Sequence, residues 1–171
     1  MAAVASDPIS RRQALLAAIL GIAMLVTVGG ALALQHLGGY IPCKLCLEQR
    51  TPYYVGVPLM ALAWLTAWRG RQRPVTRLLF AAAAALMAYG LYLAVYHAGV
   101  EWAWSPGPTD CSAVPTVETG GKGVLDTINT VVPPSCDKAA LRILGLSLAG
   151  WNAIVSSVLA VVALRAAAIR D

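Results

Sequence analysis

Charged residues are scarce in this chain: they make up 12% of its 171 residues, whereas 58% are hydrophobic. The mean hydropathy is +0.68. So few charges cannot cover the surface of a soluble globular domain of this length, and the composition therefore indicates an integral membrane protein. The chain also lacks a long polar segment that would predict a second, soluble domain, so residues 1–171 are expected to form a single integral membrane domain.

Acidic residues are the scarcer of the two charge signs, with eight Asp and Glu against thirteen Lys and Arg and a formal net charge of +5. A basic balance can indicate nucleic-acid binding. Here, however, the arginines stand between apolar runs instead of forming one basic face. We therefore expect no nucleic-acid partner.

Long apolar runs recur four times along the chain. Three of them approach the roughly 20 residues that a spanning helix requires. The other, at 53–68, is short by itself, so its helix is expected to begin upstream, near Pro42. The predicted fold class is therefore an all-α membrane protein, a four-transmembrane-helix bundle. Its spans are expected at about 14–34, 43–68, 78–96 and 146–164.

The basic residues orient this predicted bundle. Eight of them would share one side of the membrane: Arg11, Arg12, Arg69, Arg71, Arg73, Arg77, Arg165 and Arg170. Because cytoplasmic loops carry an excess of Lys and Arg, that side is predicted to be cytoplasmic, with both termini inside. The loops at about 35–42 and 97–145 then face outward.

A second interpretation of the N-terminus is open. The segment SRRQALL could begin a twin-arginine export signal that is cleaved near residues 31–33. This interpretation is less favoured because the apolar run exceeds the roughly 7–15 residues of a signal core and no soluble passenger follows. We expect a retained helix.

All four cysteines fall on the predicted outer side, as Cys43 and Cys46 before the second span and Cys111 and Cys136 in the longer loop. An even number of cysteines confined to that side favours disulfides in an oxidising compartment. Cys111 and Cys136 flank a segment rich in Gly and Pro, where a bridge would close a mobile loop. Cys43 and Cys46 stand at the expected start of a helix, where a thiolate is stabilised and exchange is favoured.

Two alternatives to active exchange remain open. Both pairs could be structural disulfides in a non-enzymatic four-helix membrane protein. All four cysteines could instead bind zinc, although Cys111 and Cys136 lack the close spacing usual in such sites. A c-type haem motif is absent, because Leu47 and not His follows Cys46.

Two further polar residues, Arg50 and His97, are candidates for a site near the cysteines. On a helix that begins near Cys43, Arg50 lies four residues after Cys46 and shares its face, so its guanidinium can approach that sulfur. It could equally be an interfacial arginine. His97, at the outer end of the third span, is either functional or merely interfacial. On the same helix Glu48 and Gln49 are expected to face solvent.

Prolines mark the second predicted span. Pro52 and Pro58 fall within it, and Pro52 follows Cys46 by about two turns. The helix is therefore expected to kink or restart near Pro52.

The segment PCKLCLEQR resembles the motif Pro-Cys-x-x-Cys-x-x-x-Arg of the DsbB family, disulfide bond formation protein B of bacterial inner membranes. The four spans, the cysteines of the longer loop and the segment LGLSLAGWN before the fourth span are also similar. The related vitamin K epoxide reductases carry their Cys-x-x-Cys late in the chain. Here it comes first.

This resemblance implies a membrane thiol:quinone oxidoreductase. A soluble periplasmic thioredoxin-like (DsbA-like) dithiol oxidase would deliver electrons to the pair Cys111 and Cys136, with Cys111 forming the mixed disulfide. Electrons would pass to Cys43 and Cys46, and then to a quinone cofactor, ubiquinone or menaquinone. The resemblance places Cys46 against the quinone ring, with Arg50 and His97 beside it. It also implies a bacterial inner-membrane location with the cysteines on the periplasmic side.

Overall fold

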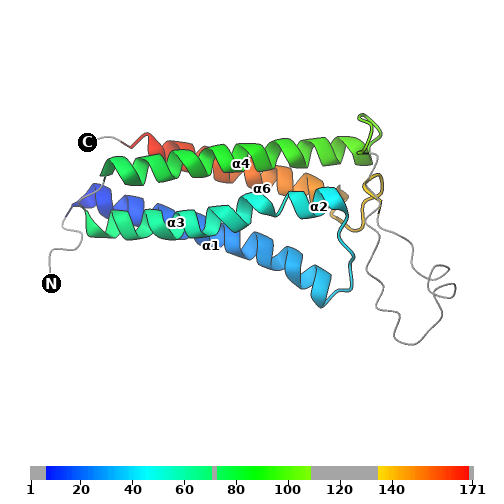
Figure 1. Cartoon of the computed structure of the whole chain (residues 1–171), viewed down its shortest axis with the longest axis horizontal. Coiled ribbons are helices and arrows are strands. Elements are labelled where there is room, and N and C mark those ends of the chain that lie inside the picture. The colour runs from blue at the N-terminus through cyan, green and yellow to red at the C-terminus, as the bar shows by residue number, and fades with distance from the viewer. Residues whose placement is uncertain (1–6, 71–72, 109–134, 170–171) are drawn as a thin grey trace.

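The computed structural model describes residues 7–70, 73–108 and 135–169, and most of these residues are helical. Long helices lie side by side along the bundle (Figure 1). They pack in the order α1 against α3, α3 against α4, and α4 against α6. Their bounds are Pro8–His36 for α1, Thr51–Arg69 for α3, Arg73–Glu101 for α4 and Leu148–Ala167 for α6.

Three of these helices, α1, α4 and α6, are long and apolar enough to cross a membrane. Large apolar side chains on their outer faces are exposed, among them Leu15, Val26 and Leu78. Such a surface suits lipid and is unfavourable in water. The prediction of a helical membrane protein is thus confirmed. That α3 is a fourth span remains a prediction.

Methionines and the chain's one phenylalanine fill the centre of the bundle. Met24, Met60, Met87 and Phe80 are fully buried. Small residues surround them, and a Cβ placed on Gly56 would lie 2.7 Å from Met24 Sδ. Small residues at helix contacts let backbones approach closely, which is how helices pack in lipid, where the hydrophobic effect does not drive them together.

The expected helix at 43–68 is two helices, α2 (Lys44–Glu48) and α3. Pro52 lies in the first turn of α3. Within one continuous helix its ring would clash with the carbonyl of Glu48, four residues earlier, and α2 ends at Glu48. Pro58 lies inside α3 without ending it. Gln49 still donates its backbone N–H to the Leu45 carbonyl at 3.1 Å, so the helical path continues through Gln49 before the break.

The expected outer loop at 97–145 begins later than predicted, because α4 continues to Glu101. His97 and Glu101 are therefore one turn apart on a helix. Before α6, a hairpin joins β1 (Arg142–Ile143) to β2 (Leu146–Ser147). Leu144 and Gly145 form its two-residue turn, both with positive φ, as a type I′ turn requires.

The two ends of the bundle differ in chemistry. Figure 1 shows α1 beginning and α6 ending at one end, with α2 and the hairpin at the other. At the first end Arg73 pairs with Asp7, and the Arg77 Nε–H donates to the Ala167 carbonyl at 3.0 Å. At the second end Ser147 caps α6, its Oγ accepting from the Gly150 N–H at 3.1 Å. This cap fixes the first turns of α6 beside α2.

Candidate functional site

The two cysteines of the Cys-x-x-Cys motif face each other at the end of the bundle that carries α2. Cys43 is the N-cap of α2, and its Sγ accepts from the Cys46 N–H at 3.3 Å. The two Sγ atoms are 2.7 Å apart, and both thiols are free. Cys43 is buried and Cys46 is half-buried. A small movement of either side chain would bring the sulfurs to bonding distance.

The two thiols differ in acidity. The hydrogen bond from Cys43 lowers the pKa of Cys46, and the Arg50 guanidinium lowers that pKa further. The same hydrogen bond, together with burial, raises the pKa of Cys43. Because the thiolate is the reactive form in exchange, Cys46 is the more nucleophilic of the two near neutral pH.

His97 connects the thiol pair to the rest of the bundle. Its Nε2 is 3.7 Å from Cys43 Sγ, and its Nδ1 is 2.6 Å from Gln49 Nε2. A glutamine Nε2 can only donate, so Nδ1 accepts and the ring proton is on Nε2. His97 therefore directs an N–H toward the Cys43 sulfur.

A chain of buried polar groups extends from Gln49. Asn152 Nδ2 donates to Gln49 Oε1 at 2.6 Å, and the Tyr53 hydroxyl donates to Asn152 Oδ1 at 2.5 Å. Ser156 Oγ is 2.9 Å from the same hydroxyl. Each member has a partner on both sides, so the chain fixes the orientation of the Gln49 amide. It also joins the cysteine end of α3 to α6.

Arg50 is attached to α1. Its guanidinium donates to Gln35 Oε1 at 2.5 Å and to the Ala31 carbonyl at 3.4 Å. The residue is only 9% exposed. These two bonds hold a positive charge at a fixed place beside Cys46.

Glu101 adds an acidic group. Its side chain is 4% exposed, and its Oε1 is 3.9 Å from His97 Nε2. Its Oε2 is buried with no hydrogen-bond partner among the residues that the structure describes. A buried carboxylate oxygen is costly without a partner, so this atom calls for an explanation.

These side chains line one cavity of about 700 Å³, whose other walls are largely apolar. Cys46, Arg50 and His97 are polar members of its wall, and Leu34 and Ile41 are apolar ones. A cavity of this size, with apolar walls and a few convergent polar groups, is typical of a small-molecule site.

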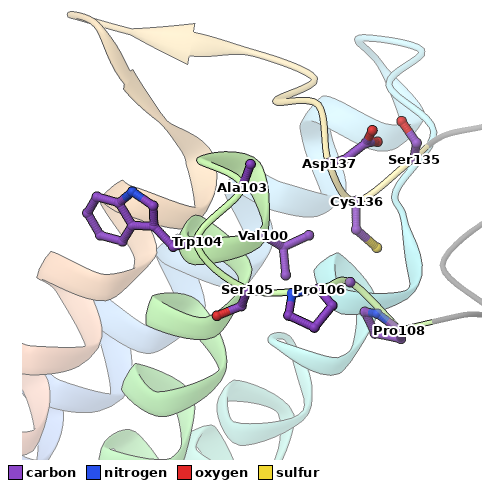
Figure 2. A pocket seen from close by; sticks show the side chains of 10 residues that line it. Val100, Ala103, Trp104, Ser105, Pro106, Pro108, Ser135, Cys136 and Asp137 are labelled. Carbon is purple, nitrogen blue, oxygen red and sulfur yellow. The ribbon is translucent and has the colours of Figure 1, made fainter.

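Cys136 lines a second cavity, which shares Ser135 with the cavity at the two thiols. It is 1% exposed and packs in one apolar cluster with Cys43, Leu45 and Val100. The second cavity has a volume of about 480 Å³. Figure 2 shows the Cys136 sulfur directed among Val100, Pro106 and Pro108. Cys136 is in a disulfide. Its expected partner, Cys111, lies outside the described residues.

The structure thus brings together four of the residues that the sequence selected: Cys43, Cys46, Arg50 and His97. The expectation that Gln49 faces solvent is wrong, since it is 7% exposed and bonded to His97. Its side chain is covered by His97 on α4 and Asn152 on α6, which both hydrogen-bond to it.

Several polar residues of the site were missed from the sequence: Gln35, Tyr53, Glu101, Asn152 and Ser156. They lie within or next to apolar runs. Polar residues inside a membrane are costly and tend to face the bundle interior. That rule was the available signal.

Comparison with known proteins decides the family. The family model for disulfide bond formation protein DsbB matches residues 11–166, most of the chain. The chain belongs to the DsbB family. No curated protein and no solved structure matches it. Membership of this family implies a membrane protein with disulfide-forming oxidoreductase activity and a thiol-disulfide partner.

Proposed function

We propose that this DsbB-family protein is a thiol:quinone oxidoreductase of the bacterial inner membrane. It reoxidises a soluble periplasmic thioredoxin-like (DsbA-like) dithiol oxidase and passes the electrons to ubiquinone or menaquinone. The observation that carries the proposal is the pair of free thiols, 2.7 Å apart, on the wall of an apolar cavity that also contains Arg50 and His97. A purely structural cysteine pair needs no such cavity.

The cavity fits a quinone headgroup. Its volume of about 700 Å³ lies within the range of small-molecule sites. A quinone is a flat apolar ring with two carbonyl oxygens, and the cavity offers apolar walls with N–H donors of Arg50 and His97 in them. When bound, a quinone supplies an acceptor for two electrons and two protons.

Cys46 and Arg50 would act together at the cavity. The Arg50 charge favours the Cys46 thiolate. The same guanidinium, held by Gln35 and Ala31, is placed to favour negative charge that develops within the cavity. One residue would therefore serve both ends of the electron transfer.

His97 would stabilise a thiolate at Cys43. With its proton on Nε2, the ring donates toward a Cys43 thiolate across 3.7 Å. When the pair is oxidised, two thiol protons and two electrons leave and one S–S bond forms. His97 Nε2 is the nearest ring nitrogen to the Cys43 sulfur, and Gln49 holds the ring in place.

The relay between the two cysteine pairs is a thiol–disulfide exchange. The partner's two thiols would reduce the bridge expected between Cys111 and Cys136, leaving the partner oxidised. The resulting thiols would reduce a bridge between Cys43 and Cys46 through a transient interloop disulfide. The packing of Cys136 in one cluster with Cys43 supports this route.

The orientation of the protein follows from its charges. Arginines gather where α1 begins and α6 ends, and the positive-inside rule makes that end cytoplasmic. The cysteine end would then face the periplasm, an oxidising compartment.

The test is to add the purified protein to a reduced thioredoxin-like dithiol oxidase and a quinone and to follow the quinone absorbance. Quinone-dependent oxidation of the dithiol supports the proposal. If no plausible donor is oxidised, the alternative stands: a non-enzymatic membrane bundle with two structural disulfides.

A further inference from the structure

Two pairs of metal-ligating side chains converge at the thiol site. The Sγ atoms of Cys43 and Cys46 and a ring nitrogen of His97 lie within 4.8 Å of one another. The cysteines are three residues apart at the start of α2, and His97 and Glu101 are four apart on α4. Residues four apart share a helix face, a spacing by which helices present two ligands to one metal ion.

The Glu101 carboxylate has no place in the electron transfer described above. Its side chain is 4% exposed, and its Oε1 is 3.9 Å from His97 Nε2. Oε2 has no hydrogen-bond partner within the described part of the chain. Buried charges are normally paired or coordinate metals. Glu101 is on the wall of the cavity that the two thiols also line.

We propose that the reduced form of the protein binds one zinc ion through Cys43, Cys46, His97 and Glu101. This ligand set, two thiolates with an imidazole and a carboxylate, matches the preference of zinc for sulfur, nitrogen and oxygen donors in a tetrahedron. The site differs from a site of four cysteines, because Cys111 and Cys136 take no part in it.

The observed geometry is close to what zinc requires. Zn–S bonds of about 2.3 Å and Zn–N bonds of about 2.0 Å in a tetrahedron place the two sulfurs about 3.8 Å apart and sulfur and nitrogen about 3.5 Å apart. Cys43 Sγ is already 3.7 Å from His97 Nε2, and the two sulfurs are 2.7 Å apart. The sulfurs must separate by about 1 Å, which a side-chain rotation provides. Glu101 lies outside the group of three ligand atoms, with its Oε1 3.9 Å from His97 Nε2, so its carboxylate must also rotate toward the sulfurs to complete the tetrahedron.

Gln49 suits the zinc-bound state as well as the metal-free one. A zinc-ligating histidine donates its second N–H to a neighbouring acceptor. Nδ1 of His97 meets the Gln49 amide at 2.6 Å, and turning that amide over together with the Asn152 amide that orients it presents Oε1 to an Nδ1–H. Zinc would therefore move the ring proton of His97 from Nε2 to Nδ1.

The oxidation state of the cysteines gates this site. Zinc binding replaces the protons of two thiols, so two protons are released and no electron moves. A disulfide between Cys43 and Cys46 has no thiolate to offer, so the oxidised protein loses the site. If the proposed function holds, zinc stops the electron transfer by holding the reduced pair, and excess zinc inhibits turnover.

The binding test needs neither quinone nor partner protein, so its failure is distinct from failure of the proposed function. The Cys111→Ser/Cys136→Ser protein, in which Cys43 and Cys46 are the remaining cysteines, is reduced anaerobically and titrated with Co²⁺, followed by Zn²⁺. We expect one Co²⁺ per chain, with thiolate charge-transfer and tetrahedral d–d absorption, and its displacement by Zn²⁺. The same protein after oxidation should give neither band.

Four variants in this background locate the ligands. His97→Gln and Glu101→Gln should each weaken Zn²⁺ binding by at least about tenfold, since even outer-shell changes cost that much. His36→Gln and Glu48→Gln are matched controls, because His36 is the other histidine of the chain and Glu48 is an acidic residue of α2. Both control proteins should bind Zn²⁺ with the affinity of the background protein. Circular dichroism shows that each variant is folded.

Three results would overturn the proposal. The first is an absence of Co²⁺ and Zn²⁺ binding by the reduced protein. The second is equal binding by the oxidised protein. The third is an unchanged affinity in either His97→Gln or Glu101→Gln, which would remove that side chain from the ligand set.

Discussion

Gln49 Nε2 donates a 2.6 Å hydrogen bond to Nδ1 of His97, and this bond determines which nitrogen of the ring faces the thiols. Gln49 is itself oriented by Asn152, which donates to its Oε1 at 2.6 Å. The consequence is a neutral imidazole with its proton on Nε2, 3.7 Å from Cys43 Sγ. Asn152 is thus a positioning residue that acts through Gln49.

Replacing Asn152 by leucine should release the ring of His97. The change removes the donor to Gln49 Oε1, so the amide can turn and both tautomers become populated. The chain has two histidines, so His36→Gln leaves His97 as the single one. In that background, nitrogen-15 NMR of the reduced protein should give an Nε2–H ring, and a tautomer mixture after Asn152→Leu. Turnover should fall by about tenfold, as for loss of a supporting hydrogen bond.

The control for this variant is Thr66→Val. It removes the 2.8 Å hydrogen bond that the Thr76 hydroxyl donates to Thr66 Oγ1, far from the thiols. The variant should therefore lose some stability while leaving the imidazole of His97 unchanged. An Nε2–H ring that persists in Asn152→Leu, with parental turnover, would show that Asn152 only packs.

The helical spacing of the cysteine motif predicted only part of this site. Helical spacing from Cys43 correctly placed Arg50 near Cys46, because both residues line the same cavity. The same spacing turned Gln49 toward solvent, and it is buried. Gln49 keeps its helical hydrogen bond to Leu45 and is buried because His97 on α4 and Asn152 on α6 bond to its side chain. Spacing along one helix cannot show which other helices pack against it.

The remaining members of the site come from distant segments. Gln35, His97 and Asn152 are separated from the cysteine motif by whole helices, and their contacts depend on how those helices pack. Apolar runs predict that helices exist but not which faces meet. His97 was selected by its position at a span end and by family resemblance. Asn152 ends the segment LGLSLAGWN that carries part of the resemblance, but neither it nor Glu101 was selected as a site residue.

Cys46 should be alkylated at lower pH than Cys43. The Cys43 hydrogen bond and the Arg50 charge lower the pKa of Cys46, so its thiolate forms first as pH rises. The measurement is iodoacetamide labelling of the reduced Cys111→Ser/Cys136→Ser protein across pH, with the modified cysteine identified by mass spectrometry. Arg50→Met removes a positive charge, so it should raise the pKa of Cys46 and shift its labelling to higher pH. Equal profiles for both cysteines would contradict this assignment.

Arg50 should matter more for quinone use than for thiol exchange. Lysine keeps the charge but loses the planar fork that donates to both Gln35 and Ala31, whereas methionine loses both. We expect the apparent Michaelis constant for quinone to rise partly in Arg50→Lys and by about tenfold or more in Arg50→Met, equivalent to about 1.4 kcal/mol. Exchange between the two cysteine pairs should be largely spared. Equal constants and equal turnover in all three proteins would make Arg50 an interfacial anchor only.

The cysteine end of the bundle should face outward in intact cells. The prediction rests on the arginines at the other end. After mild reduction, a membrane-impermeant thiol reagent should label cysteines without lysis. A cysteine placed at Ala168, just after α6, is the control and should be labelled only in lysed cells. Protection of all four native cysteines until lysis would reverse the orientation.

The stoichiometry of a single anaerobic reaction tests the central claim most directly. Reduced thioredoxin-like dithiol oxidase is mixed with excess quinone and a catalytic amount of the protein, and thiols and quinone are measured together. The account predicts one quinone reduced for each dithiol oxidised, and loss of both in Cys46→Ser and in Cys136→Ser. Dithiol oxidation without quinone reduction, or parental rates in either cysteine variant, would contradict it.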